Sequence, residues 1–175
     1  TTAWMTCYGG GLVAQFSCVG ATLRRHCADV DGHARLLGGV ISLRRGLVRG
    51  ACLYQPNGNP GGTEKYPYKL KWMSRLLEYS KQTMKTEEPL VLAGDFNVIP
   101  APQDVYNPAA WVNDALFKPQ TRDSFQALLG LGLTYALRAV PAPPRHYPSW
   151  AYQAGARPKT QSLCPHHLLL SPPAA

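Results

Sequence analysis

The stretch Leu90-Val-Leu-Ala-Gly-Asp-Phe-Asn97 holds the clearest structural signal in the chain. Its four leading apolar residues follow Pro89, which ends any helix before it, and they predict a short strand. An apolar strand flanked by a helix is typical of a buried central strand. Asp95 and Asn97 come directly after this strand, where polar side chains are well placed for chemistry, so both are candidate site residues.

The residues before this strand predict two more strands, a loop and a helix. Two β-prone runs, residues 36–43 and 47–54, should be neighbouring antiparallel strands. Residues 55–62 are dense in Pro, Asn and Gly and predict a loop. A helix should follow this loop, because apolar residues recur there at helical spacing. These residues are Leu70, Met73, Leu77 and Met84.

The residues after the strand predict a long connection and then a second helix. The connection is rich in Pro and Asn and covers residues 99–119, so it is either functional or mobile. Thr121 is expected to cap the helix, and Gly130 to end it. The expected buried stripe of this helix is Phe125, Leu128 and Leu129. Residues 168–170 predict a last strand, and we expect residues 1–175 to form a single domain.

Composition favours a globular protein with a polyanionic partner. The 175 residues include 18 Lys and Arg against 10 Asp and Glu, a formal charge of +8. Such a surface attracts phosphate, although a basic protein that never meets nucleic acid would show the same charge. No apolar run approaches the ~20 residues of a membrane helix, so no membrane association is expected. Five cysteines, an odd number, favour free thiols in a reducing compartment.

The chain resembles the exodeoxyribonuclease III family in three successive motifs: Tyr54-Gln-Pro-Asn-Gly-Asn59, Glu64-Lys-Tyr-Pro-Tyr-Lys69 and Gly94-Asp-Phe-Asn97. Further similar segments are Ile99-Pro-Ala-Pro-Gln-Asp-Val-Tyr106, Trp111-Val-Asn-Asp-Ala115, Tyr152-Gln-Ala-Gly155 and His167-Leu-Leu-Leu-Ser171. Over residues 47–171 the motifs occur in the order and with the spacing of the family. The resemblance is looser over residues 31–43 and slight over residues 1–30.

This resemblance implies a fold, a cofactor and a partner. The fold would be an α/β protein, a partial two-layer sandwich of the DNase I-like type within the endonuclease/exonuclease/phosphatase superfamily. The cofactor would be magnesium or manganese, and the reaction would be hydrolysis of DNA phosphodiesters at abasic sites and 3′ ends in DNA repair. By analogy with the family, a cytoplasmic location is expected, and a mitochondrial one stays open.

The resemblance also implies roles for individual residues. Asp95 would orient or deprotonate the attacking water, and Asn97 would hydrogen-bond the phosphate or the attacking oxygen. Tyr54 would contact the phosphate from the opposite side. Asn57, in the adjoining loop, and Trp150 are candidate substrate-binding residues.

The spacing of Asp95 and Asn97 suits this chemistry. A phosphodiester repels nucleophiles through its negative charge, so catalysis needs a cation, a positioned base and preorganised donors. Residues two apart on an extended stretch face the same way, so this carboxylate and this amide should converge on one phosphate. Taken alone, residues 94–97 would more commonly be a polar turn that closes a buried strand.

Several acids of the family pattern have no counterpart here. Residues 1–30 offer no candidate for its early Asn or its metal-binding Glu, and its closing Asp-His pair would lie beyond Ser171, so the metal ligands are unknown. Tyr135, Ala151 and His166 stand where the family usually has Asp. We therefore expect this chain alone to be inactive, because each lost acid removes cation affinity. Segments missing from such a sandwich would also leave unpaired sheet edges for a partner chain to cover.

Three hypotheses follow from this pattern. The first is an active metal-dependent DNA-repair nuclease whose missing parts come from elsewhere. The second is a pseudoenzyme that serves as a structural or nucleic-acid-associated subunit of a larger assembly. The third is a decayed gene fragment, for which the irregular first thirty residues are the best argument.

Overall fold

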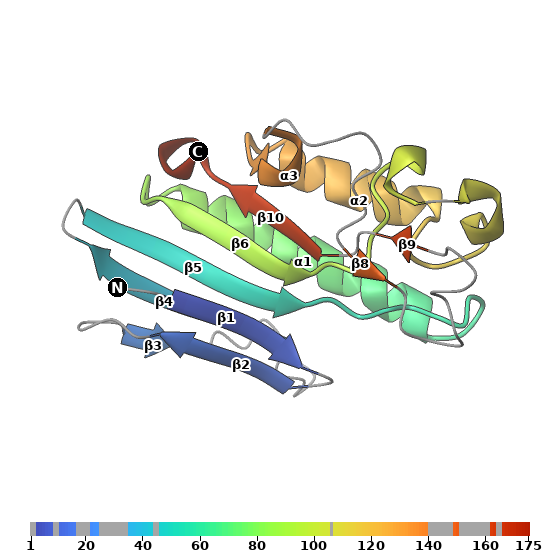
Figure 1. The fold of residues 1–175 in the computed structure, drawn as a ribbon, viewed down its shortest axis with the longest axis horizontal. Coiled ribbons are helices and arrows are strands. Elements are labelled where there is room, and N and C mark those ends of the chain that lie inside the picture. The colour runs from blue at the N-terminus through green and yellow to red at the C-terminus, as the bar shows by residue number, and fades with distance from the viewer. Residues whose placement is uncertain are drawn as a thin grey trace.

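The computed structural model describes residues 3–8, 11–16, 22–24, 35–43, 46–105, 107–139, 149–150, 162–163 and 166–175. Their main feature is a six-stranded sheet with the strand order β3-β4-β5-β6-β10-β7 (Figure 1). Its strands are β3 (Thr22–Arg24), β4 (Leu36–Leu43), β5 (Gly46–Tyr54), β6 (Leu90–Asp95), β10 (His166–Leu170) and β7 (Thr134–Tyr135).

Two short strand pairs and several helices complete the described structure. The strand pairs are β1 (Ala3–Tyr8) with β2 (Gly11–Phe16), and β8 (Ser149–Trp150) with β9 (Ser162–Leu163). The α-helices are α1 (Lys65–Met84), α2 (Pro119–Leu129) and α3 (Ala136–Ala139). The 3₁₀ helices are η1 (Pro102–Asp104), η2 (Pro108–Trp111) and η3 (Pro172–Ala174).

The chain order of β5, α1 and β6 sets the geometry of the sheet. Strands β4 and β5 pair antiparallel, as the sequence predicts, and the segment after β5 is the predicted loop. Helix α1 then returns the chain, so that β6 pairs parallel with β5. Strand β10 pairs antiparallel with the other side of β6. The predicted interior strand is therefore confirmed, and the carboxyl ends of β5 and β6 meet at one edge of the sheet.

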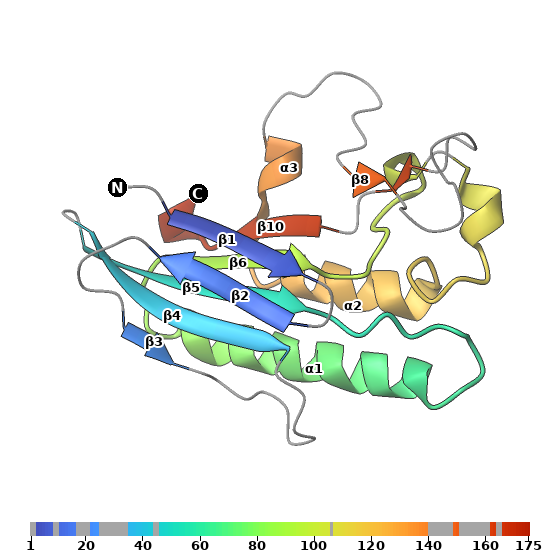
Figure 2. The same ribbon diagram turned by 60° about the horizontal axis from the view of Figure 1, so that its bottom comes forward.

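The core lies between the sheet and the helices α1 and α2, which Figure 2 shows on the same side of β5 and β6. Its buried residues include Trp72 and Leu76 from α1, Phe125 from α2, and Leu92 and Leu169 from the strands. Each fully buried large apolar side chain in this cluster contributes roughly 1.5–3 kcal/mol to the stability of the fold.

The face that α1 buries differs from the predicted stripe. Met73 is buried, whereas Leu70, Leu77 and Met84 are only partly buried. The residues that α1 buries are Lys69, Trp72, Met73, Leu76 and Ser80. The buried face of α1 therefore includes two polar side chains, and both find backbone acceptors: Ser80 Oγ donates to the carbonyl of Leu76, and Lys69 donates to three loop carbonyls.

The start of α2 also differs from the prediction. The helix begins at Pro119, whose missing N–H costs nothing in the first turn, so Thr121 lies inside the helix and does not cap it. The Thr121 hydroxyl instead donates to the carbonyl of Ala115 at 2.8 Å, which ties the helix to the loop before it. Gly130 is the C-terminal cap, as predicted.

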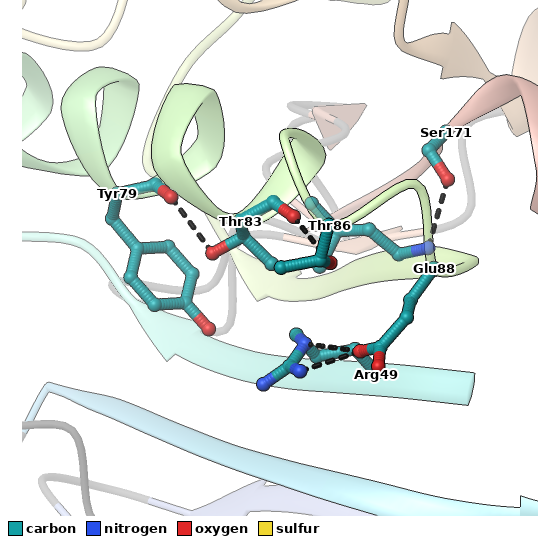
Figure 3. Close-up of polar contacts among 7 residues, drawn as sticks. Arg49, Tyr79, Thr83, Thr86, Glu88 and Ser171 are labelled. Atoms are coloured by element: carbon teal, nitrogen blue, oxygen red, sulfur yellow. Dashed lines mark hydrogen bonds and ion pairs between the residues drawn. The ribbon is translucent and has the colours of Figure 1, made fainter. Parts of the chain in front are cut away.

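Polar contacts also hold the opposite edge of the sheet, where β5 and β6 begin (Figure 3). The Arg49 guanidinium donates from Nε and Nη2 to one carboxylate oxygen of Glu88. Ser171 Oγ accepts a 2.8 Å hydrogen bond from the backbone N–H of Leu90. The ion pair is partly exposed and worth about 0–1 kcal/mol. The buried serine contact joins the end of β10 to the start of β6.

None of the helices in the described part of the chain is long and apolar enough to cross a membrane.

Candidate functional site

Tyr54, Asp95 and His166 form one row across three strands at the carboxyl edge of β5 and β6. Tyr54 ends β5 and is the register partner of Asp95, which ends β6. On its other side, Asp95 is the antiparallel partner of His166, which begins β10. Register partners on neighbouring strands point to the same face of a sheet. The structure therefore brings Tyr54 and Asp95 together, with His166 beside them. These three residues are called the site row below.

Gly94 makes the close contact between β5 and β6 possible. Its φ of +141° lies in a region that favours glycine, and a Cβ placed there would lie 2.0 Å from the carbonyl oxygen of Leu53. The backbone of β6 therefore approaches β5 directly beside the site row. This glycine allows the close strand pairing in which Asp95 is the register partner of Tyr54.

Asn97 adopts a left-handed backbone conformation with a φ of +47°. The prediction that residues 95–97 are extended is therefore wrong, and the predicted convergence of Asp95 and Asn97 on one phosphate stays a prediction. The chain turns instead, because Asp95 Oδ1 accepts a 2.8 Å hydrogen bond from the backbone N–H of Asn97. Asparagine tolerates this conformation better than most residues, which explains its fit here.

The Asn97 side chain is nevertheless held in one orientation next to Asp95. Its Nδ2 donates to the carbonyl of Gln55 at 2.8 Å, and its Oδ1 accepts from Asn57 Nδ2 at 3.1 Å. Asn57 Oδ1 in turn accepts from the backbone N–H of Asn59 at 3.2 Å. The loop after β5 and the loop after β6 are thus joined through their asparagines. Asn57 itself is exposed and available to a ligand.

A second set of contacts ties these loops to the segment before α2. Asn59 Nδ2 donates to the carboxylate of Asp114 at 3.0 Å, and Asn59 Oδ1 accepts from the backbone N–H of Ala115. Lys69 Nζ lies beneath them and donates to the carbonyls of Asn57, Asn97 and Ala115. Lys69, Asn59 and Asp114 lie within the motifs that resemble the family, but the sequence predicted no role in the site for any of them. One signal in the sequence could have indicated Lys69. It lies three residues before Trp72, and this spacing places a cation on the same, buried face of α1.

Burial sets the protonation behaviour of both charged groups near Asn97. It raises the pKa of the Asp95 carboxyl, against the hydrogen bond from the Asn97 N–H and the nearby His166 and Lys69. Burial also lowers the pKa of Lys69 to about 7, against the attraction of Asp114 and Asp95. A carboxylate with a raised pKa is a better proton acceptor than an exposed one, so Asp95 is suited to act as a general base.

The partly buried Tyr135 and the buried His167 form a pair behind the site row. His167 Nε2 donates to the carbonyl of Val98 at 3.0 Å, so Nδ1 is the acceptor for the Tyr135 hydroxyl at 2.7 Å. The His167 ring packs against Phe96 and Phe125. Burial lowers the pKa of His167 to about 4, so the imidazole is neutral at pH 7. Tyr135, at a position where the resemblance implies an Asp, is thus a hydrogen-bond donor to a neutral histidine.

Gln55 lies between Tyr54 and Asn57 and is fully buried. Within the described residues, neither its Nε2 nor its Oε1 has a hydrogen-bond partner. A buried amide without partners costs roughly 1–3 kcal/mol relative to its exposure in the unfolded chain. The unpaired Gln55 amide therefore lowers the stability of the loop that carries Asn57.

Replacing Gln55 with leucine is expected to raise the free energy of unfolding by about 1–2 kcal/mol, because it removes the unpaired amide and keeps the buried volume. Urea denaturation followed by circular dichroism measures this change. Gln126→Leu is the matched control, since Gln126 is exposed on α2 and its replacement should change stability by less than about 0.5 kcal/mol. A Gln55→Leu protein no more stable than the original would contradict the expectation.

The described residues do not by themselves form a divalent-cation site. Asp95 is the one carboxylate in the site row, and no group of three or more His, Cys, Asp or Glu that could hold a metal gathers among the residues the structure describes. The Trp150 side chain lies outside the described residues, so its predicted substrate contact stays a prediction.

Residues 6–164 match the endonuclease/exonuclease/phosphatase family. The chain belongs to this family. An exodeoxyribonuclease of Bacillus subtilis is 36% identical over 121 residues, which are 69% of this chain and 47% of that protein. The match confirms the resemblance to the exodeoxyribonuclease III family that the motifs within residues 47–171 indicate.

Solved structures of this family share the fold. An AP endonuclease from Archaeoglobus fulgidus is similar with a TM-score of 0.73 and 29% identity, over 83% of this chain and 55% of that one. A Neisseria 3′ phosphatase bound to product DNA hairpin has the same TM-score and identity, over 88% of this chain and 58% of that one. The predicted DNase I-like α/β fold is therefore confirmed. The chain spans about half the length of these relatives.

Proposed function

We propose that this chain binds DNA at an abasic site or a 3′ end and takes part in hydrolysis of the phosphodiester there, with one phosphate seated over the site row. The observation that carries this proposal is the register of β5 and β6, which sets Tyr54 beside Asp95 at the edge where Asn97 is also fixed. The Neisseria relative with bound DNA and the formal charge of +8 support a nucleic-acid partner.

Each residue has a distinct part in this proposal. Asp95, with its raised pKa, accepts a proton from the attacking water. Asn97 is held by Gln55 and Asn57, so it meets the phosphate without reorganising, which is the property that makes a polar group effective in a transition state. The Tyr54 hydroxyl contacts the phosphate from β5. The exposed Asn57 contacts the DNA backbone next to it.

Magnesium or manganese belongs to the chemistry that the family implies. The donor set of the site row, one carboxylate with an imidazole and a phenol, does not match the all-oxygen shell that magnesium requires. The roles proposed above are therefore assigned to side chains of this chain only, and none is assigned to a metal ion. Two expectations stay predictions: that this chain alone is inactive, which the cleavage assay tests, and that a protein partner covers the sheet edges.

Asp95→Asn is expected to reduce cleavage of DNA at least about a hundredfold, because it removes the proton acceptor and keeps the shape of the side chain. The assay incubates a duplex with one abasic site, and a duplex with a recessed 3′ end, with the full chain and magnesium or manganese. Asp123→Asn is the control, since Asp123 is exposed on α2 away from the site row. Equal rates for the wild-type and Asp95→Asn proteins would exclude the proposed hydrolysis.

A second candidate function is DNA binding without cleavage, and His166 is the observation that favours it. The family has an acid at this position, whereas here an imidazole lies beside Asp95. Such a protein would bind the same duplex with an affinity that falls steeply with salt, and Asp95→Asn would not weaken binding. Binding without cleavage by the wild-type protein would favour this candidate over the first.

A further inference from the structure

Lys69 is the buried centre where the three loops around the candidate site meet. It lies in the second turn of α1, and none of its surface is exposed. Its Nζ donates to the carbonyl of Asn97 at 2.7 Å, to that of Asn57 at 3.0 Å and to that of Ala115 at 3.1 Å. These carbonyls belong to the loop after β6, the loop after β5 and the segment before α2.

The number and direction of these contacts match an ammonium group. An ammonium carries three N–H donors and no acceptor, and here three carbonyls receive them. A neutral amine would leave one carbonyl without its donor. Burial favours the neutral amine and lowers the pKa of Lys69 to about 7, whereas Asp114 and Asp95 both favour the charged form. The charge is thus balanced inside the protein, where an unpaired ammonium would be costly.

The loop after β5 is shaped around this side chain. Gly58 has a φ of +87°, and a Cβ placed on it would lie 2.7 Å from Lys69 Cδ and 3.2 Å from Ala115 Cβ. The loop backbone therefore lies directly on the lysine stem. Because Asn57 and Asn59 flank this glycine, their positions depend on that contact.

We propose that Lys69 is a positioning residue that sets the orientation of Asn57 and Asn97 toward the phosphate. This inference rests on the proposed function. Lys69 touches no reacting atom: it holds the two backbone carbonyls of the asparagines whose side chains bond each other. Movement of either loop by about 1 Å would misplace Asn97, and misplacements of that size cost about a hundredfold in rate.

The test compares Lys69→Met with Lys71→Met. Methionine keeps the length of the stem and removes the three donors, and Lys71 is exposed on the same helix. In protein labelled with ¹⁵N-asparagine, the side-chain amide signals of Asn57 and Asn97 should shift in Lys69→Met and stay in place in Lys71→Met. In the cleavage assay, kcat should fall about a hundredfold for Lys69→Met with a smaller change in KM.

The outcomes separate this inference from the proposed function. A wild-type protein that does not cleave overturns the hydrolysis, while the asparagine signals still decide the role of Lys69. Unchanged asparagine signals in a folded Lys69→Met protein overturn the inference, even if wild-type cleavage is robust. If Lys69→Met does not fold, an NMR measurement on the Lys69 ammonium of the wild-type protein tests the inference. A slowly exchanging lysine ammonium with proton contacts to Asn97 and Ala115 supports the inference, and its absence overturns it.

Discussion

Replacing Gly94 with alanine is expected to destabilise the fold by roughly 4 kcal/mol or more. The added Cβ would lie 2.0 Å from the carbonyl oxygen of Leu53, which is backbone and cannot move aside without breaking the β5–β6 pairing. The φ of +141° adds conformational strain for any residue with a side chain. Domains of this size are usually stable by only about 5–15 kcal/mol, so much of the protein would unfold at moderate urea concentrations.

Gly50→Ala is the matched control for this prediction. Gly50 lies in β5 close to Leu53, and a Cβ there would meet nothing within 4 Å, so stability should stay the same or rise slightly. Urea denaturation midpoints of the two variants and the wild-type protein give the comparison. A Gly94→Ala protein within about 1 kcal/mol of wild type would show that β6 can move away from β5. The close approach of Tyr54 and Asp95 would then not depend on this glycine.

Lowering the pH from 6.5 to 4 is expected to cost about 3 kcal/mol of stability through His167 alone. In the folded protein burial lowers the pKa of His167 to about 4, whereas its ordinary value is 6.5. Between these pH values the unfolded chain binds a proton that the folded chain does not. Stability therefore falls as the pH falls through this window, and the loss is complete below pH 4.

His167→Gln isolates this contribution. Glutamine does not titrate and still offers a donor to the carbonyl of Val98. The raised pKa values of Asp95 and Asp104 act in the opposite direction and are present in both proteins. The difference in unfolding free energy between wild type and variant should therefore shrink by about 3 kcal/mol from pH 7 to pH 4. A constant difference across that range would mean that folding does not shift the pKa of His167.

The elements that the sequence predicted correctly are those whose signals are local. The predicted strand at residues 90–93, which the structure extends to Asp95, the antiparallel pair before it and the end of α2 at Gly130 depend on apolar runs and on glycine and proline at defined positions. The family followed from ordered motifs. The prediction that assumed regular strand geometry for residues 95–97 failed. The backbone of Asn97 is left-handed there, and its N–H donates a hydrogen bond to Asp95.

The sequence alone determined that this chain is an α/β protein of the exodeoxyribonuclease type with a carboxylate and an amide after an interior strand. Only the tertiary structure decided that Tyr54 stands beside Asp95, that Tyr135 bonds His167, and that Lys69 lies buried beneath three loops. The physical reason is sequence distance. These contacts join residues far apart in the chain, and a lysine becomes a buried donor only where three separate backbone carbonyls converge on it.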